Sequence, residues 1–175
     1  MAVIMVTVTF SANAQSYSIQ WYNPNLMYDR YGNPMPEDSG CVIRLYTTTD
    51  DTISFSIIGG VATPTGDDVW SGLQFSLLSG GDVGLGYANM TPSTLSAGQK
   101  IYSVIFSQSP AAGYFAIADN AVQTISYDAT KSFTYITDKD VQQSDWKSIP
   151  EPATIGLLSL GAGLTLLVSR RKRYS

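Results

Sequence analysis

Leu73-Gln74-Phe75-Ser76-Leu77 alternates apolar and polar side chains, and the same pattern recurs along most of the chain. Alternation of this kind, rich in β-branched and aromatic residues, is typical of strands with one buried face. Seven further stretches show it strictly or loosely, at 17–21, 41–46, 53–57, 102–106, 114–118, 122–127 and 133–136. No body segment keeps helical spacing over the roughly ten residues that a stable helix usually needs.

Turn-forming residues separate these stretches, at 31–34, 59–60, 64–68, 79–82, 96–99 and 109–113. Short strands joined by such turns predict an all-β fold, either an antiparallel β-sandwich or a jelly-roll-like domain. We expect the apolar alternate positions to face its interior. These positions are Ile19, Trp21, Ile43, Leu45, Phe55, Ile57, Leu73, Phe75, Leu77, Val104, Phe106, Phe115, Ile117, Ile125 and Phe133.

The C-terminal residues have a different pattern. They read Pro150-Glu151-Pro152, then an uncharged apolar stretch over 153–169, then Arg170-Arg171-Lys172-Arg173. The two prolines keep the first motif extended and out of a helix. The apolar stretch spans about 25 Å as a helix, enough for a thin bilayer core, and it predicts a transmembrane helix. The basic residues stay on the cytoplasmic side, so the body is exported.

Residues 150–173 resemble the PEP-CTERM sorting signal of exopolysaccharide-producing Gram-negative bacteria, in which a Pro-Glu-Pro motif, a hydrophobic helix and an Arg-rich end follow in this order. The resemblance implies recognition by an exosortase, a membrane-embedded transpeptidase-like enzyme. It also implies transfer of the body to the cell surface or extracellular matrix after a transient inner-membrane stage. Pro150, Glu151 and Pro152 are then recognition residues of a substrate. Whether the tail is cleaved or kept as an anchor stays open.

The N-terminal residues also indicate export. An apolar run precedes Ala12 and Ala14, the small residues that signal peptidase accepts before Gln15. We therefore predict a signal peptide over 1–14. No basic residue precedes Arg30, so we expect the signal to be truncated at its start. The alternative is a hydrophobic first strand of the domain.

The two signals leave one domain over 15–137 and a polar linker over 138–149. Residues 15–149 hold six Lys and Arg against thirteen Asp and Glu, a net charge of −7. A surface of this charge disfavours nucleic acid as a partner. Cys41 is the single cysteine, so no disulfide can form within the chain. We interpret it as a small buried residue, with an intermolecular bridge as the alternative.

Histidine is absent, which removes the commonest general base, nucleophile partner and metal ligand. Asp50-Asp51 and Asp67-Asp68 are adjacent pairs, and neighbours in a strand point to opposite faces. We interpret both pairs as turn residues and predict no catalytic residues, with a hydrolase as a competing class. We expect no cofactor. Structural Ca²⁺ at the loop residues Asp67, Asp68 and Asp82 is the alternative.

Aromatic residues gather before the turn at 32–34, namely Trp21, Tyr22, Tyr28 and Tyr31. One interpretation places Trp21 in the core and the tyrosines over a sheet edge. The other is a carbohydrate-binding module that stacks these rings on matrix glycans. From the sequence we expect an exported, non-catalytic surface or matrix protein, processed by signal peptidase and an exosortase and associated with exopolysaccharide or biofilm.

Overall fold

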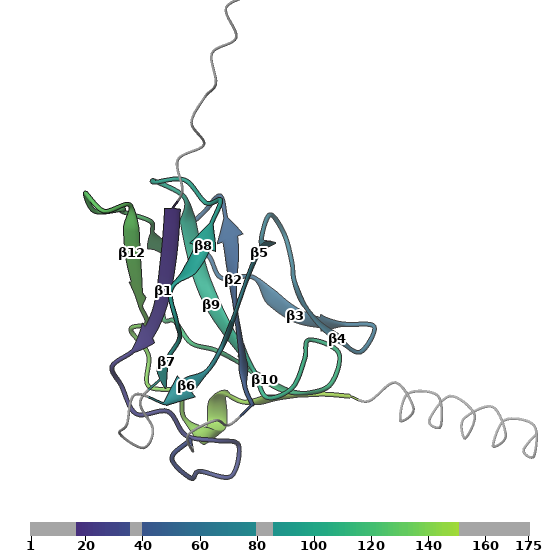
Figure 1. Ribbon diagram of the computed structural model, residues 1–175. Coiled ribbons are helices and arrows are strands. Elements are labelled where there is room, and N and C mark those ends of the chain that lie inside the picture. The colour runs from purple at the N-terminus through teal and green to yellow at the C-terminus, as the bar shows by residue number, and fades with distance from the viewer. Residues whose placement is uncertain (1–16, 36–39, 80–85, 151–175) are drawn as a thin grey trace, which may run out of the picture.

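The computed structural model describes residues 17–35, 40–79 and 86–150, and within them the fold is nearly all β (Figure 1). The first sheet has the order β12-β1-β7-β6, and β8 pairs with β1. Its strands are β12 (Ser132–Ile136), β1 (Tyr17–Asn23), β7 (Gly86–Tyr87), β6 (Leu78–Ser79) and β8 (Thr91–Ser93).

The second sheet has the order β13-β10-β9-β2-β5, and β11 pairs with β9. Its strands are β13 (Lys147–Ile149), β10 (Gly113–Ile117), β9 (Lys100–Phe106), β2 (Val42–Thr48), β5 (Val69–Ser76) and β11 (Gln123–Thr124). A separate hairpin joins β3 (Phe55–Ile58) to β4 (Val61–Pro64). Gly59 and Gly60 form its two-residue turn, and both have positive φ, which glycine adopts at little cost.

These elements form three layers, visible from left to right in Figure 1 as the first sheet, the second sheet and the hairpin. Between the two sheets lies a buried cluster that includes Ile19 and Trp21 of β1 and Ile43 and Ile105 of the second sheet. The opposite face of the second sheet carries another buried cluster, against which Phe55 of the hairpin packs. The predicted alternation is therefore confirmed, and the second sheet buries both of its faces.

Strand β9 is the centre of this arrangement. Ile101 and Ile105 belong to the cluster between the sheets, while Tyr102, Val104 and Phe106 belong to the cluster under the hairpin. A strand covered on both faces has no polar side to alternate with, which explains its nearly continuous apolar sequence. Four of the predicted interior residues are only half-buried, namely Phe55, Ile57, Ile117 and Phe133.

All eight predicted strands are present, although the one expected at 122–127 is reduced to β11. One pairing differs from the antiparallel expectation: β1 and β12 run parallel, with Ile19 opposite Phe133. A parallel pair needs a long connection, and these strands come from opposite ends of the described chain. The short strands β4, β6, β7, β8 and β13 were not predicted.

Several predictions lie outside the described residues: the signal peptide over 1–14 with Ala12 and Ala14, Asp82, Glu151, Pro152, the helix over 153–169, and Arg170, Arg171, Lys172 and Arg173. Within the described ranges, no helix has the length and apolar character needed to cross a bilayer.

Candidate functional site

The last described residues are part of the folded domain. Strand β13 pairs antiparallel with β10, so that Ile149 lies opposite Gly113 and Ser148 opposite Tyr114. Ile149 is buried in the cluster under the hairpin, whereas Pro150, the next residue, is exposed. The polypeptide therefore leaves the core within a single peptide unit, directly before Glu151.

The linker predicted over 138–149 is thus wrong. Val141 is fully buried between the sheets, and the half-buried Trp146 packs against the same cluster. The indole Nε1 of Trp146 donates a hydrogen bond of 2.8 Å to the carbonyl oxygen of Tyr28. Lys139 forms an ion pair of 2.7 Å with Asp145. The overall polarity of this segment hid its few apolar side chains, and these anchor it to the domain.

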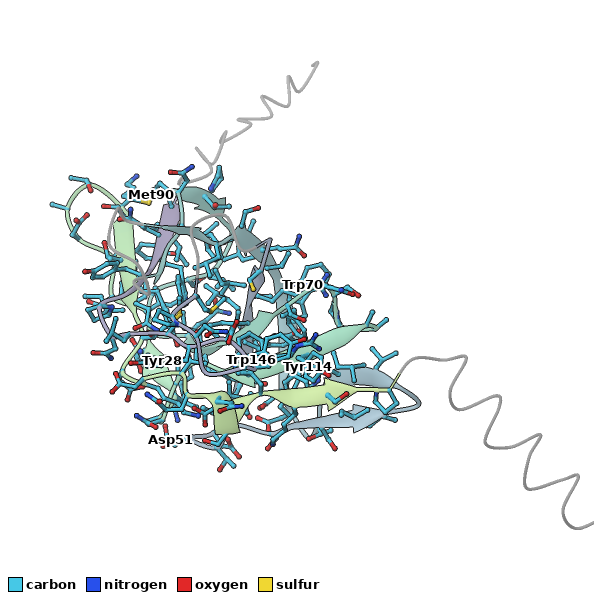
Figure 2. All side chains as sticks on the ribbon, turned by 90° about the horizontal axis from the view of Figure 1, so that it is seen from below. Tyr28, Asp51, Trp70, Met90, Tyr114 and Trp146 are labelled. Carbon is cyan, nitrogen blue, oxygen red and sulfur yellow. The ribbon has the colours of Figure 1, made fainter. Side chains whose placement is uncertain are left out.

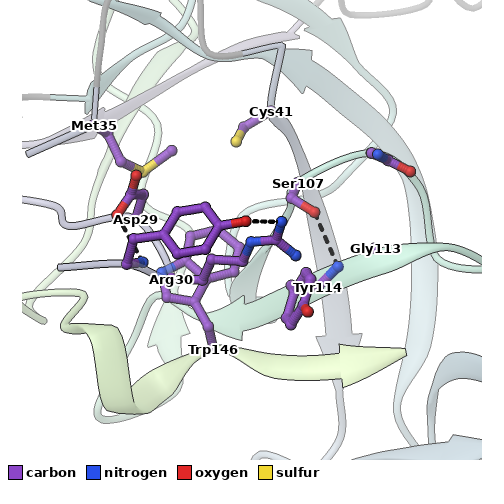
Figure 3. A pocket seen from close by; sticks show the side chains of 10 residues that line it. Asp29, Arg30, Met35, Cys41, Ser107, Gly113, Tyr114 and Trp146 are labelled. Carbon is purple, nitrogen blue, oxygen red and sulfur yellow. Dashed lines mark hydrogen bonds between the residues drawn. The ribbon is translucent and has the colours of Figure 1, made fainter. Parts of the chain in front are cut away.

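A cavity of about 250 Å³ opens beside β10 and β13 (Figure 3). The turn at 29–31, Met35 and Cys41 form one side, and Ser107, Gln108, Gly113 and Tyr114 form another. Trp146 forms part of the wall immediately before β13. Cys41 is buried here, as its small apolar side chain led us to expect.

Arg30 is held between two tyrosine rings at this cavity. Its guanidinium carbon lies 4.4 Å from the ring centroid of Tyr31 and 4.2 Å from that of Tyr114, and the guanidinium donates a hydrogen bond to the Tyr31 hydroxyl. Cation–π contacts of this kind are worth about 0.5–1 kcal/mol each at exposed sites. Neither ion pair found among the described residues involves Arg30. The cavity is therefore lined by a guanidinium that forms no ion pair among the described residues, and by the carboxylate of Asp29 from the same turn.

The turn that carries Arg30 is closed by Asp29. A carboxylate oxygen of Asp29 accepts hydrogen bonds from the backbone amides of Tyr31 and Asn33, at 2.8 and 2.9 Å. Partial burial opposes ionisation of Asp29, but these hydrogen bonds outweigh it and lower its pKa. Gly32 has a φ of 82°, and a Cβ there would lie 3.1 Å from Oε1 of Gln143. Glycine at this position lets the turn approach the segment before β13.

The four predicted glycan-contacting aromatics occupy different places. Trp21 is 0% exposed in the core between the sheets, so the prediction that it contacts a glycan is corrected. Tyr22 is half-buried in β1 and does not line the cavity. Tyr28 accepts the Trp146 hydrogen bond with its carbonyl oxygen and does not line the cavity. Tyr31 lines the cavity and is 65% exposed. Tyr114 and Trp146 come from β10 and the C-terminal segment, and sequence reasoning did not connect them with Tyr31 (Figure 2).

The paired aspartates lie elsewhere, in two loops at the end of the second sheet. Asp67 accepts hydrogen bonds from the backbone amide and hydroxyl of Thr49. These bonds come first among the causes that lower the pKa of Asp67. Asp50 accepts a bond of 2.7 Å from the amide of Thr52. The bond of Asp50 closes a local turn, whereas the bonds of Asp67 tie the turn before β5 to the loop after β2.

One buried carboxylate was missed by the sequence reasoning. Asp119 follows β10 and is 3% exposed, and its Oδ2 accepts hydrogen bonds of 2.7 Å from both the amide and the hydroxyl of Ser103. Its Oδ1 accepts a bond of 3.3 Å from Gln123. Burial raises the pKa of Asp119 to about 6, against the opposing effect of the Ser103 hydrogen bonds. Asp119 ties β9 to the connection between β10 and β11.

Comparison with known families assigns the C-terminal segment. Residues 148–173 match the model of the PEP-CTERM protein-sorting motif. The match begins at Ser148, inside β13, so the sorting motif overlaps the last strand of the domain. Neither a curated protein nor a solved structure matches the chain.

An all-β domain that ends in this motif defines a class of protein: an exported substrate of an exosortase, sorted at the membrane toward the cell surface. The chain carries a PEP-CTERM sorting signal, and the resemblance predicted from Pro150, Glu151 and Pro152 is confirmed.

Proposed function

We propose that this chain is a non-catalytic protein of the cell surface or extracellular matrix, where it associates with exopolysaccharide or biofilm. The observation that carries the proposal is the sorting motif at 148–173. A signal peptidase removes residues 1–14, and the inner membrane holds the chain through 153–169 until an exosortase acts on Pro150-Glu151-Pro152. The net charge of −7 over residues 15–149 suits solubility outside the cell.

The chemistry of the described residues supports a role without catalysis. The sequence contains no histidine. The carboxylates of Asp29 and Asp50 close turns by accepting backbone hydrogen bonds, and the carboxylate of Asp67 accepts one from Thr49 in the loop after β2. Asp119, which has a raised pKa, is buried against Ser103 and does not line the cavity beside β13. A hydrolase would need a carboxylate facing a cleft with its proton free to move.

Expression of the full chain in an exosortase-producing bacterium and in the same strain without exosortase tests the sorting proposal. We expect a shortened form at the cell surface in the first strain and the longer form in the membrane fraction of the second. Glu151→Gln should slow the shortening, because it removes the charge of the motif. Asp140→Asn removes one exposed charge from the domain and should leave sorting unchanged. Equal size and location of the chain in both strains would refute the proposal.

Glycan binding at the cavity beside β13 is a second candidate function. Tyr31 and Trp146 offer aromatic surface there, and Arg30 offers hydrogen-bond donors in a plane between two rings. Aromatic faces stack on sugar rings, and a guanidinium suits hydroxyl and carboxylate groups. Arg30 already covers one face of Tyr31 and one face of Tyr114, so Trp146 and the open face of Tyr31 are the surfaces that support stacking.

A glycan array with the full chain tests this candidate. We expect binding to acidic or neutral matrix glycans that Tyr31→Ala abolishes while the circular dichroism spectrum stays native. Trp70→Ala is the matched control, because Trp70 is an aromatic residue 46% exposed outside the cavity (Figure 2). Absence of binding at millimolar glycan, or equal loss in both variants, would remove this candidate.

A further inference from the structure

Two loops meet at the end of the second sheet where β2 ends and β5 begins. The loop after β2 provides Asp50, and the turn before β5 provides Asp67 and Asp68. The backbone amide of Ser54 donates a hydrogen bond of 2.7 Å to Oδ2 of Asp68. The backbone amide of Thr65 donates one of 2.9 Å to the carbonyl oxygen of Ser54. These bonds hold the loops together. As a result, one carboxylate oxygen from each of the three aspartates lies within 4.8 Å of the other two.

Three carboxylates at this separation repel one another, and no side-chain cation compensates them. The nearby Lys100 forms its ion pair with Asp51, at 3.0 Å, and the other ion pair of the described residues joins Lys139 to Asp145. Charges so close destabilise a fold unless a counter-charge is present. The cluster therefore lacks a positive partner within the described parts of the chain.

Asp68 supplies an independent observation. It is 5% exposed, and with Oδ2 engaged by Ser54 its Oδ1 is buried with no hydrogen-bond partner in the described structure. The hydroxyl of Tyr102 is the polar group next to Asp68, and it too is buried outside good hydrogen-bond geometry. Burial, followed by the interaction of this hydroxyl with Asp68, raises the pKa of Tyr102, which keeps the hydroxyl neutral. A buried carboxylate oxygen without a partner is costly, and coordination of a cation removes that cost.

We propose that Asp50, Asp67 and Asp68 form a Ca²⁺ site. Ca²⁺ binds oxygen at 2.3–2.6 Å, so two oxygens on one ion lie up to about 5 Å apart, and the three carboxylates fit this limit. Water completes the six to eight ligands. Extracellular modules bind Ca²⁺ with dissociation constants of about 10⁻⁴–10⁻³ M, which suits an exported chain. The alternative drawn from the sequence placed Ca²⁺ at Asp67, Asp68 and Asp82. The proposed site keeps the first two and adds Asp50 from a different loop.

Thermal unfolding of the full chain in detergent tests the site, with circular dichroism as the readout. In 5 mM CaCl₂ we expect a midpoint about 3–6 °C higher than in EGTA with matched ionic strength. Asp50→Asn and Asp67→Asn should each abolish this rise. Asp51→Asn is the matched control, since Asp51 is the exposed neighbour that binds Lys100 and is not in the cluster, and it should keep the rise.

Two results would overturn the site. One is a midpoint that is the same in CaCl₂ and in EGTA for the unchanged chain. The other is a Ca²⁺-dependent rise that persists in both Asp50→Asn and Asp67→Asn while their spectra in EGTA are native. An equal rise with MgCl₂ would overturn the assignment to Ca²⁺, because Mg²⁺ demands shorter distances and stricter geometry.

Discussion

The buried carboxylate of Asp119 predicts an unusual dependence of stability on pH. Its pKa in the folded chain is about 6, compared with an ordinary value of 3.8. As the pH falls, the folded chain binds this proton at a higher pH than the unfolded chain does. The free energy of unfolding therefore rises as the pH falls through 6, and it stops rising below 3.8. Over the whole interval the gain is about 3 kcal/mol, and between pH 7.5 and pH 4.5 it is about 2 kcal/mol.

Urea unfolding in EGTA at pH 7.5, 6.5, 5.5 and 4.5 measures this gain. Asp119→Asn removes the titrating group, so its stability should lack the rise, whereas Asp140→Asn should keep it. The carboxylates of Asp29, Asp67 and Asp128 have lowered pKa values, so their contribution to stability is lost only as the pH falls below about 3.8. A stability that is flat or falling between pH 7.5 and 4.5 in the unchanged chain, or a rise that Asp119→Asn retains, would refute the reasoning.

Three further substitutions test the packing around β13, each by urea unfolding. Gly113→Ala should cost about 1–3 kcal/mol, because Gly113 has a φ of 84° and its Cβ would lie 2.6 Å from Oγ of Ser107. Ile149→Ala should cost about 2 kcal/mol or more, since Ile149 is 2% exposed in the cluster under the hairpin. Trp146→Phe should cost about 1 kcal/mol, because it leaves the carbonyl of Tyr28 without its donor.

Each of these has a control or a contradicting outcome. Ile136→Ala truncates an isoleucine that is 48% exposed and should cost less than 1 kcal/mol. If Ile149→Ala cost no more stability than Ile136→Ala, β13 would not be packed against the cluster under the hairpin. Gly98→Ala also replaces a glycine with positive φ, but its Cβ meets nothing within 4 Å, so it should cost less than Gly113→Ala. If Trp146→Phe lost no stability, the hydrogen bond from Trp146 to Tyr28 would not contribute to the stability of the domain.

Alternation was enough to find the strands with a solvated face, because their period of two is local. It placed Ile19 and Trp21 of β1, and Leu73 and Phe75 of β5, correctly inside. The sequence of β9 carried a further signal, a nearly unbroken apolar run over 101–106, which marks a strand covered on both sides. The hairpin that covers it could not be placed, because the pairing of layers depends on tertiary contacts.

The candidate sites were only partly predictable for the same reason. The sorting motif could be identified because its parts are contiguous from Pro150 to Arg173. The cavity joins Arg30 to Tyr114 and Trp146, which are far apart in sequence, and no local pattern relates them. Asp50 meets Asp67 only because a loop and a turn are tied together by backbone hydrogen bonds. Val141 and Ile149 were the signal that could have shown the C-terminal segment to be packed.

The overlap between β13 and the sorting motif limits the distance between the domain and any molecule attached at the motif. If another molecule were joined to the chain within Pro150-Glu151-Pro152, at most three residues would separate it from the domain. Three extended residues span about 10 Å. Because Ile149 is buried in the domain, so short a connecting segment has little conformational freedom. So short a connection would keep the β13 edge of the second sheet close to whatever the chain is joined to.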